Sequence, residues 1–240
     1  MEKIDSHRIR VTSLGDLLLD AADRFPSRNA LIFPDQRHTY LSLVTAAYQR
    51  ARSLYGLGVR SGDYVGLLMA NCPEYMELLL GCSFLGAVAV PMNARYKSAE
   101  LAYVVADADL KVIVTSDLIA DYADFGQLLQ AAFSDFEVEQ DETNLSLSGA
   151  PLMRAVVMLG AHTPPGMLSQ RQFSALADQV DVADIDVLRS RVRLEQPAIM
   201  MYTSGTTANP KGCPLSHGLL VRNGINMNRE RYFMTEQDVF

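Results

Sequence analysis

The chain has 240 residues, which is long enough for one large domain or two modest ones. Apolar residues make up 49% of it and charged residues 20%, a globular balance that excludes an intrinsically disordered chain. Lys and Arg number 21 against 28 Asp and Glu, and the net charge of −7 argues against a nucleic-acid-binding protein, whose affinity depends on surplus cations.

Three cysteines and one apolar run indicate in which cellular compartment the protein is expected. Cys72, Cys82 and Cys213 are odd in number and form no C-x-x-C pair, so the sequence predicts neither a disulfide framework nor a zinc site. The longest apolar run, residues 78–92, is interrupted by glycine, serine and proline and falls short of the roughly 18–20 residues of a membrane span. We interpret it as a buried helix followed by a buried strand. Because residues 1–8 also lack the apolar core of a secretory signal, we expect a cytoplasmic protein.

The first part of the chain alternates between helical and extended patterns. Ser13 predicts the start of a helix whose apolar positions recur at helical spacing until Pro26. Gly58 suits a left-handed residue after a second, amphipathic helix. The elements expected here are helices at 14–25 and 41–57 and strands at 30–33, 37–40 and 64–68.

The same alternation continues through the middle of the chain. Asn71 is expected to cap a helix that has Pro73 in its first turn. The elements expected next are a helix to residue 85, strands at 87–90, 112–114, 155–159 and 198–202, a helix at 98–106, and a helical or irregular region at 170–194. Short apolar strands separated by helices indicate a mostly parallel sheet layered with helices on both faces, so the predicted fold class is α/β.

Residues 134–151 break this rhythm with a block of acidic residues followed by a Ser/Gly stretch. An acidic binding tail and a solvated surface loop are the two interpretations. We favour the surface loop, because blocks of like charge are usually solvated.

The most informative segment is residues 202–212, which directly follow the apolar strand expected at 198–202. In an open α/β sheet, ligands gather beyond the carboxyl ends of the strands. A triphosphate needs hydroxyl donors, backbone amides that approach closely and a fixed cation. The segment offers all three: the hydroxyls of Thr203, Ser204, Thr206 and Thr207, the glycines Gly205 and Gly212, and the ammonium of Lys211.

The segment differs from the common P-loop, which reads G-x-x-x-x-G-K-[ST] and runs straight into a helix. Here Lys211 precedes a glycine, and Pro214 separates it from a helix expected to begin near Ser216. The loop itself must then hold the phosphates. On composition alone, a polar Ser/Thr turn with a chance lysine is the alternative.

The run YTSGTTANPKG at 202–212 resembles the phosphate-loop signature of the adenylate-forming superfamily, which contains acyl-CoA synthetases, luciferases and peptide-synthetase adenylation domains. The resemblance extends from about Ser13 to Phe240, and residues 86–93, GAVAVPMN, favour the acyl- or aryl-CoA ligase branch. One departure is Ala208, which stands where the family usually has a third glycine, so an ordinary backbone conformation is expected there.

The resemblance implies that residues 1–240 are the N-terminal portion of an AMP-binding domain, an incomplete part of the large N-terminal domain of adenylate-forming enzymes. It implies a ligase that joins a carboxylic acid to coenzyme A in two steps: the carboxylate attacks the α-phosphorus of ATP, pyrophosphate leaves, and the acyl-adenylate reacts with the thiol. Magnesium is implied as the ion that stabilises negative charge, with its ligands unassigned. Lys211 is implied as the catalytic cation on the β- and γ-phosphates.

Later motifs of the family, among them a catalytic lysine on a C-terminal domain, do not occur within 1–240. We therefore expect a truncated chain that does not turn over alone. The alternatives are a non-catalytic nucleotide-binding or interaction protein built from half of this fold, and another adenylating enzyme such as a peptide-synthetase adenylation domain.

Three further expectations concern single residues and assembly. His217 could approach the phosphates, but a structural role is favoured. Cys213, beside Lys211, is interpreted as an inert buried cysteine rather than a reactive thiol. An incomplete sheet would expose apolar surface and an unpaired strand edge, so self-association is possible.

Overall fold

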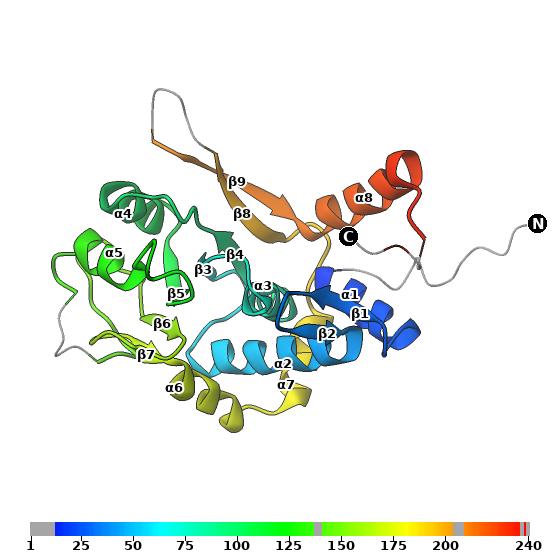
Figure 1. The fold of residues 1–240 in the computed structure, drawn as a ribbon, viewed down its shortest axis with the longest axis horizontal. Coiled ribbons are helices and arrows are strands. Elements are labelled where there is room, and N and C mark those ends of the chain that lie inside the picture. The colour runs from blue at the N-terminus through cyan, green and yellow to red at the C-terminus, as the bar shows by residue number, and fades with distance from the viewer. Residues whose placement is uncertain (1–12, 137–140, 204–208, 236–237, 239–240) are drawn as a thin grey trace, which may run out of the picture.

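The computed structural model describes residues 13–136, 141–203, 209–235 and 238. Within them, seven strands form one sheet in the order β7-β6-β5-β3-β4-β8-β9 (Figure 1). All neighbouring pairs are parallel except β8 with β9. The strands of this sheet are β3 (Tyr64–Leu68), β4 (Val88–Pro91), β5 (Leu110–Ser116), β6 (Ala155–Leu159), β7 (Leu168–Ser169), β8 (Pro197–Thr203) and β9 (Lys211–Ser216). The predicted α/β class with a mostly parallel sheet is confirmed.

Helices cover both faces of the sheet, as the short apolar strands predicted. Along β5, Val112 and Val114 belong to one buried cluster and Ile113 to the other, because successive side chains of a strand point to opposite faces. The first face packs against α1 (Leu14–Arg24), α2 (Tyr40–Gly56), α3 (Pro73–Leu85), α6 (Gln170–Ala175) and α7 (Val182–Ser190); the second packs against α4 (Ser98–Asp107) and α5 (Phe125–Ala132). The sheet is thus a buried, rigid base.

Local signals account for most element boundaries. The Ser13 hydroxyl accepts a hydrogen bond from the Asp16 amide at 3.1 Å and begins α1, as predicted. The antiparallel hairpin of β1 (Asn29–Ile32) and β2 (Arg37–Thr39) and the left-handed Gly58 after α2, with φ of +92°, are also confirmed. The predicted Asn71 cap is wrong: Cys72 occupies the N-cap of α3, without a side-chain hydrogen bond, and Pro73 follows it. Pro73 already has the helical φ and lacks an amide that would need a partner, and the Tyr75 amide donates to the Cys72 carbonyl at 3.2 Å, so the helix starts without a capping side chain.

The segment at 134–151 combines buried and exposed residues in its described part. Leu145, Leu147 and Ala150 are buried in the same cluster as α4 and α5. Hydrogen bonds hold the backbone of this segment; for example, the Ser148 amide donates to the Asp135 carboxylate at 2.6 Å. The apolar residues thus anchor this acidic stretch to the second face of the sheet.

The remaining elements are a 3₁₀ turn, η2 (Leu176–Gln179), the helix α8 (His217–Met227) and a π-helical turn, η3 (Asn228–Tyr232). The helix α5, capped by Asp124, was not predicted because its eight residues are fewer than the roughly 11–18 over which helical periodicity is recognised. Among the residues described, no helix is both long enough and apolar enough to cross a membrane.

A buried ion pair joins α2 to α3 on the first face. The Arg50 guanidinium donates to the Glu77 carboxylate at 2.9 Å, and both side chains are almost fully buried. The His38 imidazole lies 3.4 Å from the other carboxylate oxygen. Removal of one partner would leave an unpaired charge in the core.

We therefore expect Glu77→Ala to lower the free energy of unfolding by about 3–5 kcal/mol, because Arg50 would stay buried without its partner. Urea unfolding followed by circular dichroism measures this. Glu74→Ala, on the same helix but partly exposed, is the matched control and should cost much less. Equal losses for the two variants would contradict the assignment of Glu77 as the buried partner.

Candidate functional site

The predicted phosphate segment lies at the end of a β-hairpin. β8 and β9 pair in antiparallel register from Pro197↔Ser216 to Thr203↔Lys211, and the hairpin extends away from the sheet (Figure 1). The strand β9 was not predicted, because Lys211, Gly212 and Pro214 are poor strand formers. A proline is tolerated here because β9 is the edge strand of the sheet.

The hairpin brings three of the predicted site residues together. Thr203 and Lys211 lie directly opposite each other in the last register pair, and Gly212 lies opposite Tyr202. The side chains of Thr203 and Lys211 are exposed. The other four predicted residues, Ser204, Gly205, Thr206 and Thr207, lie outside the described residues, as does Ala208.

The ammonium of Lys211 has no ion-pair partner in the described part of the chain. An exposed, unpaired lysine opposite a threonine hydroxyl can receive an anion without first breaking an internal contact. A phosphate group uses both kinds of donor. The chemistry of this end of the hairpin therefore fits a phosphate-bearing ligand.

The N-terminus of α8 is not an alternative phosphate site. The amides of His217 and Gly218 donate to the carbonyls of Gln196 and Leu194 at 3.1 and 2.8 Å, and the Leu219 amide donates to the Ser216 hydroxyl at 3.2 Å. A P-loop leaves such amides open for its ligand. The helix start is therefore closed, in agreement with the predicted departure from the P-loop pattern.

His217 has the structural role that the sequence favoured. Its side chain is fully buried, and Nδ1 accepts a hydrogen bond from the Leu14 amide at 3.2 Å, which ties α1 to α8. Burial lowers the pKa of His217 from 6.5 to about 4. The imidazole is therefore neutral at physiological pH, and it points into the core rather than toward a ligand.

The prediction of a buried Cys213 is wrong: the residue is exposed on β9. The other two cysteines are buried, which raises the pKa of the Cys72 thiol to about 11 and that of Cys82 to about 12. Cys213 and Lys211 are two positions apart on one strand and thus on the same face. The edge position of β9 leaves this part of the strand in contact with solvent.

Tyr202 is the site residue that the sequence analysis left without a role. Its hydroxyl donates to the Asp107 carboxylate, at the end of α4, at 2.6 Å. Burial, reinforced by the hydrogen bond to Asp107, raises the pKa of Tyr202 well above its ordinary value. No local signal could have found this contact, since 95 residues separate the two partners.

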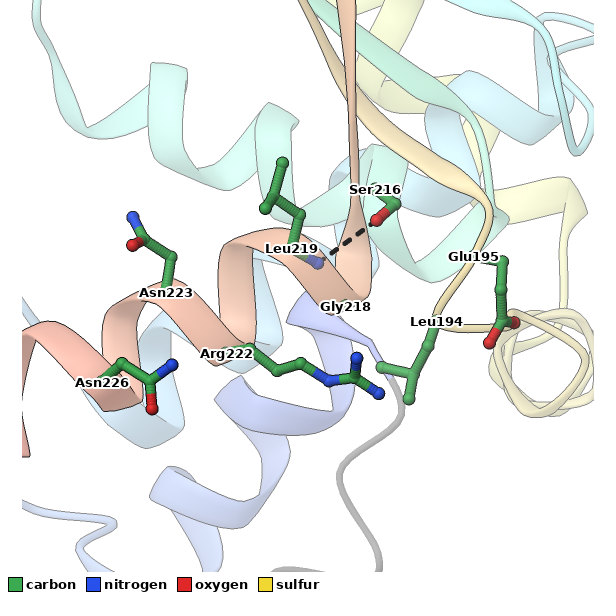
Figure 2. Close-up of a pocket in the computed structure, with 8 residues that line it drawn as sticks. All are labelled: Leu194, Glu195, Ser216, Gly218, Leu219, Arg222, Asn223 and Asn226. Carbon is green, nitrogen blue, oxygen red and sulfur yellow. Dashed lines mark hydrogen bonds between the residues drawn. The ribbon is translucent and has the colours of Figure 1, made fainter.

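A groove of about 360 Å³ runs beside α8 (Figure 2). It is lined by Leu194, Glu195, Ser216, Gly218, Leu219, Arg222, Asn223 and Asn226. Arg222, Asn223 and Asn226 point in different directions from the helix instead of converging (Figure 2). The groove lies at the Ser216 end of β9, roughly 17 Å of strand away from Lys211. It shares none of the predicted site residues.

Within the described ranges, no group of three or more His, Cys, Asp or Glu side chains could hold a metal ion. The described side chains at the hairpin end contribute a cation and a hydroxyl rather than a carboxylate cluster. Their donor set suits an anionic ligand.

Residues 18–240 match the family described as AMP-binding enzyme. The chain belongs to this family. Among its relatives, the 2-succinylbenzoate–CoA ligase of Oceanobacillus iheyensis is 29% identical over 202 residues, which are 84% of this chain and 33% of that protein. A long-chain-fatty-acid–CoA ligase of Bacillus subtilis is 27% identical over 220 residues, 88% of this chain and 38% of that protein.

Solved structures of this family have the same fold. The crystal structure of the anthranilate CoA ligase AuaEII in complex with anthranoyl-AMP superposes with a TM-score of 0.69 at 25% identity, covering 87% of this chain and 35% of that one. The chain thus spans only a third to two fifths of the length of the relatives named above.

The pKa of His217 makes stability depend on pH. The unfolded chain takes up a proton at this imidazole below pH 6.5, whereas the folded chain does so only near pH 4. The free energy of unfolding should therefore fall by ~1.4 kcal/mol per pH unit as the pH drops through this window, to a loss of about 3 kcal/mol at pH 4. Urea unfolding at several pH values measures the slope. His217→Gln should flatten it, the exposed control His162→Asn should not, and identical slopes in all three proteins would refute the prediction.

The cysteines predict a simple thiol titration. Only Cys213 should react rapidly with a thiol reagent at pH 8, because the other two are buried and their pKa values are raised. Cys213→Ser should abolish the fast phase, and Cys72→Ser should leave it intact. Two or three fast thiols in the native chain would contradict the burial of Cys72 and Cys82.

Proposed function

We propose that this chain is the nucleotide-binding, N-terminal part of an ATP-dependent acyl- or aryl-acid–CoA ligase. The observation that carries the proposal is the exposed Lys211 opposite Thr203, without an ion-pair partner among the described residues, in a segment that resembles the phosphate loop of adenylate-forming enzymes. The names of the relatives, which are CoA ligases, support the ligase branch.

In this proposal the phosphate segment is 202–212, and its residues bind the triphosphate of ATP. Lys211 contacts the β- and γ-phosphates and stabilises the negative charge that grows on departing pyrophosphate. The hydroxyl of Thr203 donates from the opposite strand, and Ser204, Gly205, Thr206, Thr207 and Gly212 complete the cradle. When ATP is bound, it supplies the phosphorus that a carboxylate attacks.

The rest of the reaction requires more than these residues. A carboxylic acid and coenzyme A are the proposed partners, and magnesium enters with the nucleotide phosphates, in keeping with a hairpin end that offers donors rather than carboxylates. A cytoplasmic location is also proposed, which the three free thiols support. Since the chain spans 33% of the 2-succinylbenzoate–CoA ligase, the proposed activity belongs to a longer enzyme. The 240 residues alone should release no pyrophosphate in response to an acid, and measured acid-dependent release would contradict this.

Binding of ATP to the chain tests the site directly. Lys211→Ala should weaken binding by about one to two orders of magnitude, because it removes a charge-assisted contact worth on the order of 1.5–3 kcal/mol. Isothermal titration calorimetry with Mg·ATP measures the dissociation constants.

The matched control is Arg171→Ala, which removes one positive charge from an exposed side chain of α6, on the face of the sheet opposite to α4. Its affinity for ATP should stay within about twofold of the unsubstituted chain, since exposed charges far from a ligand are largely screened. Equal weakening by both variants would indicate a general charge effect and overturn the assignment of Lys211. An affinity for ATP that is unchanged in Lys211→Ala would also overturn the assignment of Lys211.

A further inference from the structure

The hairpin that carries the candidate site joins the rest of the sheet along one edge, where β8 lies beside β4. β8 pairs with its neighbour β4 through a single register pair, Ala89↔Ile199, whereas it pairs with β9 along its whole length. The end of the hairpin extends beyond the other strands of the sheet (Figure 1). A two-stranded ribbon is only marginally stable by itself, so its orientation needs a further contact.

Tyr202 provides such a contact. Along β8 the side chains alternate: Met200 and Tyr202 pack against the second buried cluster, and Met201 and Thr203 are exposed. The Tyr202 hydroxyl then reaches Asp107 at 2.6 Å, across to α4. The bond joins a half-buried phenol to an exposed carboxylate, and hydrogen bonds to charged groups are stronger than those between neutral groups.

Gly212 leaves room for the phenol. A Cβ atom at position 212 would lie 2.9 Å from the Met200 sulfur and 3.2 Å from both Cζ and Oη of Tyr202. A side chain there would require Met200 to shift and the Tyr202 phenol, which bonds Asp107, to give by a few tenths of an ångström. The packing of Met200 and Tyr202 thus favours glycine at position 212. This reason is separate from the close approach of the backbone to a phosphate.

The position of Asp107 also indicates a role outside its own helix. It is the last residue of α4, where the helix dipole disfavours a negative charge. Two tyrosines compensate it: Tyr202 donates to Oδ2, and Tyr103 donates to Oδ1 at 3.2 Å. Only Tyr202 belongs to the hairpin.

We propose that Tyr202 is a positioning residue, which through Asp107 clamps the β8–β9 hairpin to α4 and so fixes where Thr203 and Lys211 stand relative to the sheet. This inference rests on the proposed nucleotide site for its functional meaning. The clamp itself is a property of the chain without ligand, and it can be measured without one.

The test compares Tyr202→Phe, which keeps the ring over Gly212 but loses the hydroxyl, with Tyr103→Phe, which removes the other hydrogen bond to the same carboxylate. Amide hydrogen exchange of residues 197–203 and 211–216 is followed without nucleotide. Tyr202→Phe should speed exchange there on the order of tenfold, the factor expected for one lost hydrogen bond to a charged group, with the melting temperature nearly unchanged. Tyr103→Phe should leave the exchange rates of these two segments unchanged.

A nitroxide on Cys213, the exposed thiol of β9, gives an independent spectroscopic readout. Its spectrum should sharpen in Tyr202→Phe and in Asp107→Ala, but not in Tyr103→Phe. Unchanged exchange and an unchanged spectrum in Tyr202→Phe would overturn the clamp, as would equal changes in both tyrosine variants.

Binding of Mg·ATP then connects the clamp to the site. Tyr202→Phe should weaken ATP binding several-fold, and unchanged affinity despite a loosened hairpin would overturn the positioning role. If the unsubstituted chain bound no ATP, the proposed function would fail, whereas the exchange experiment would still decide the clamp.

Discussion

The antiparallel pairing of β8 with β9 decides where the candidate site can be. Every other strand in the sheet is parallel to its neighbours, and a parallel strand would have carried the chain after Thr203 back through a helix. The antiparallel pairing instead brings Lys211 opposite Thr203. A cation and a hydroxyl that are eight positions apart in the sequence thus lie next to each other at the end of β8.

The buried sheet gives this hairpin a fixed base. Alternating residues of β3, β5 and β6 fill two separate apolar clusters, so the strands are held from both faces. The hairpin contacts that base through the pairing of Ile199 with Ala89 and through the side chains of Met200 and Tyr202. A ligand site on such a ribbon combines exposure, which lets a nucleotide approach, with a limited number of contacts that set its orientation.

The beginning of α8 is used for structure rather than for binding. Its first amides are bonded to the carbonyls of Leu194 and Gln196, and the buried His217 receives the Leu14 amide from α1. The helix is thereby joined to the start of the described chain. The helix start therefore offers no open amides of the kind that a P-loop presents to its phosphates.

The sequence by itself determined the α/β class, most helix and strand positions, the family and the segment that carries the phosphate signature, because these depend on periodicity, caps and a long local motif. It failed at the cap of α3, at α5, at β9 and at the exposure of Cys213. Only the tertiary structure decided that Lys211 faces Thr203, that Gly212 makes room for Tyr202, and that Tyr202 reaches Asp107. Those contacts depend on how strands and helices that are distant in sequence pack together, and no local sequence pattern encodes that packing.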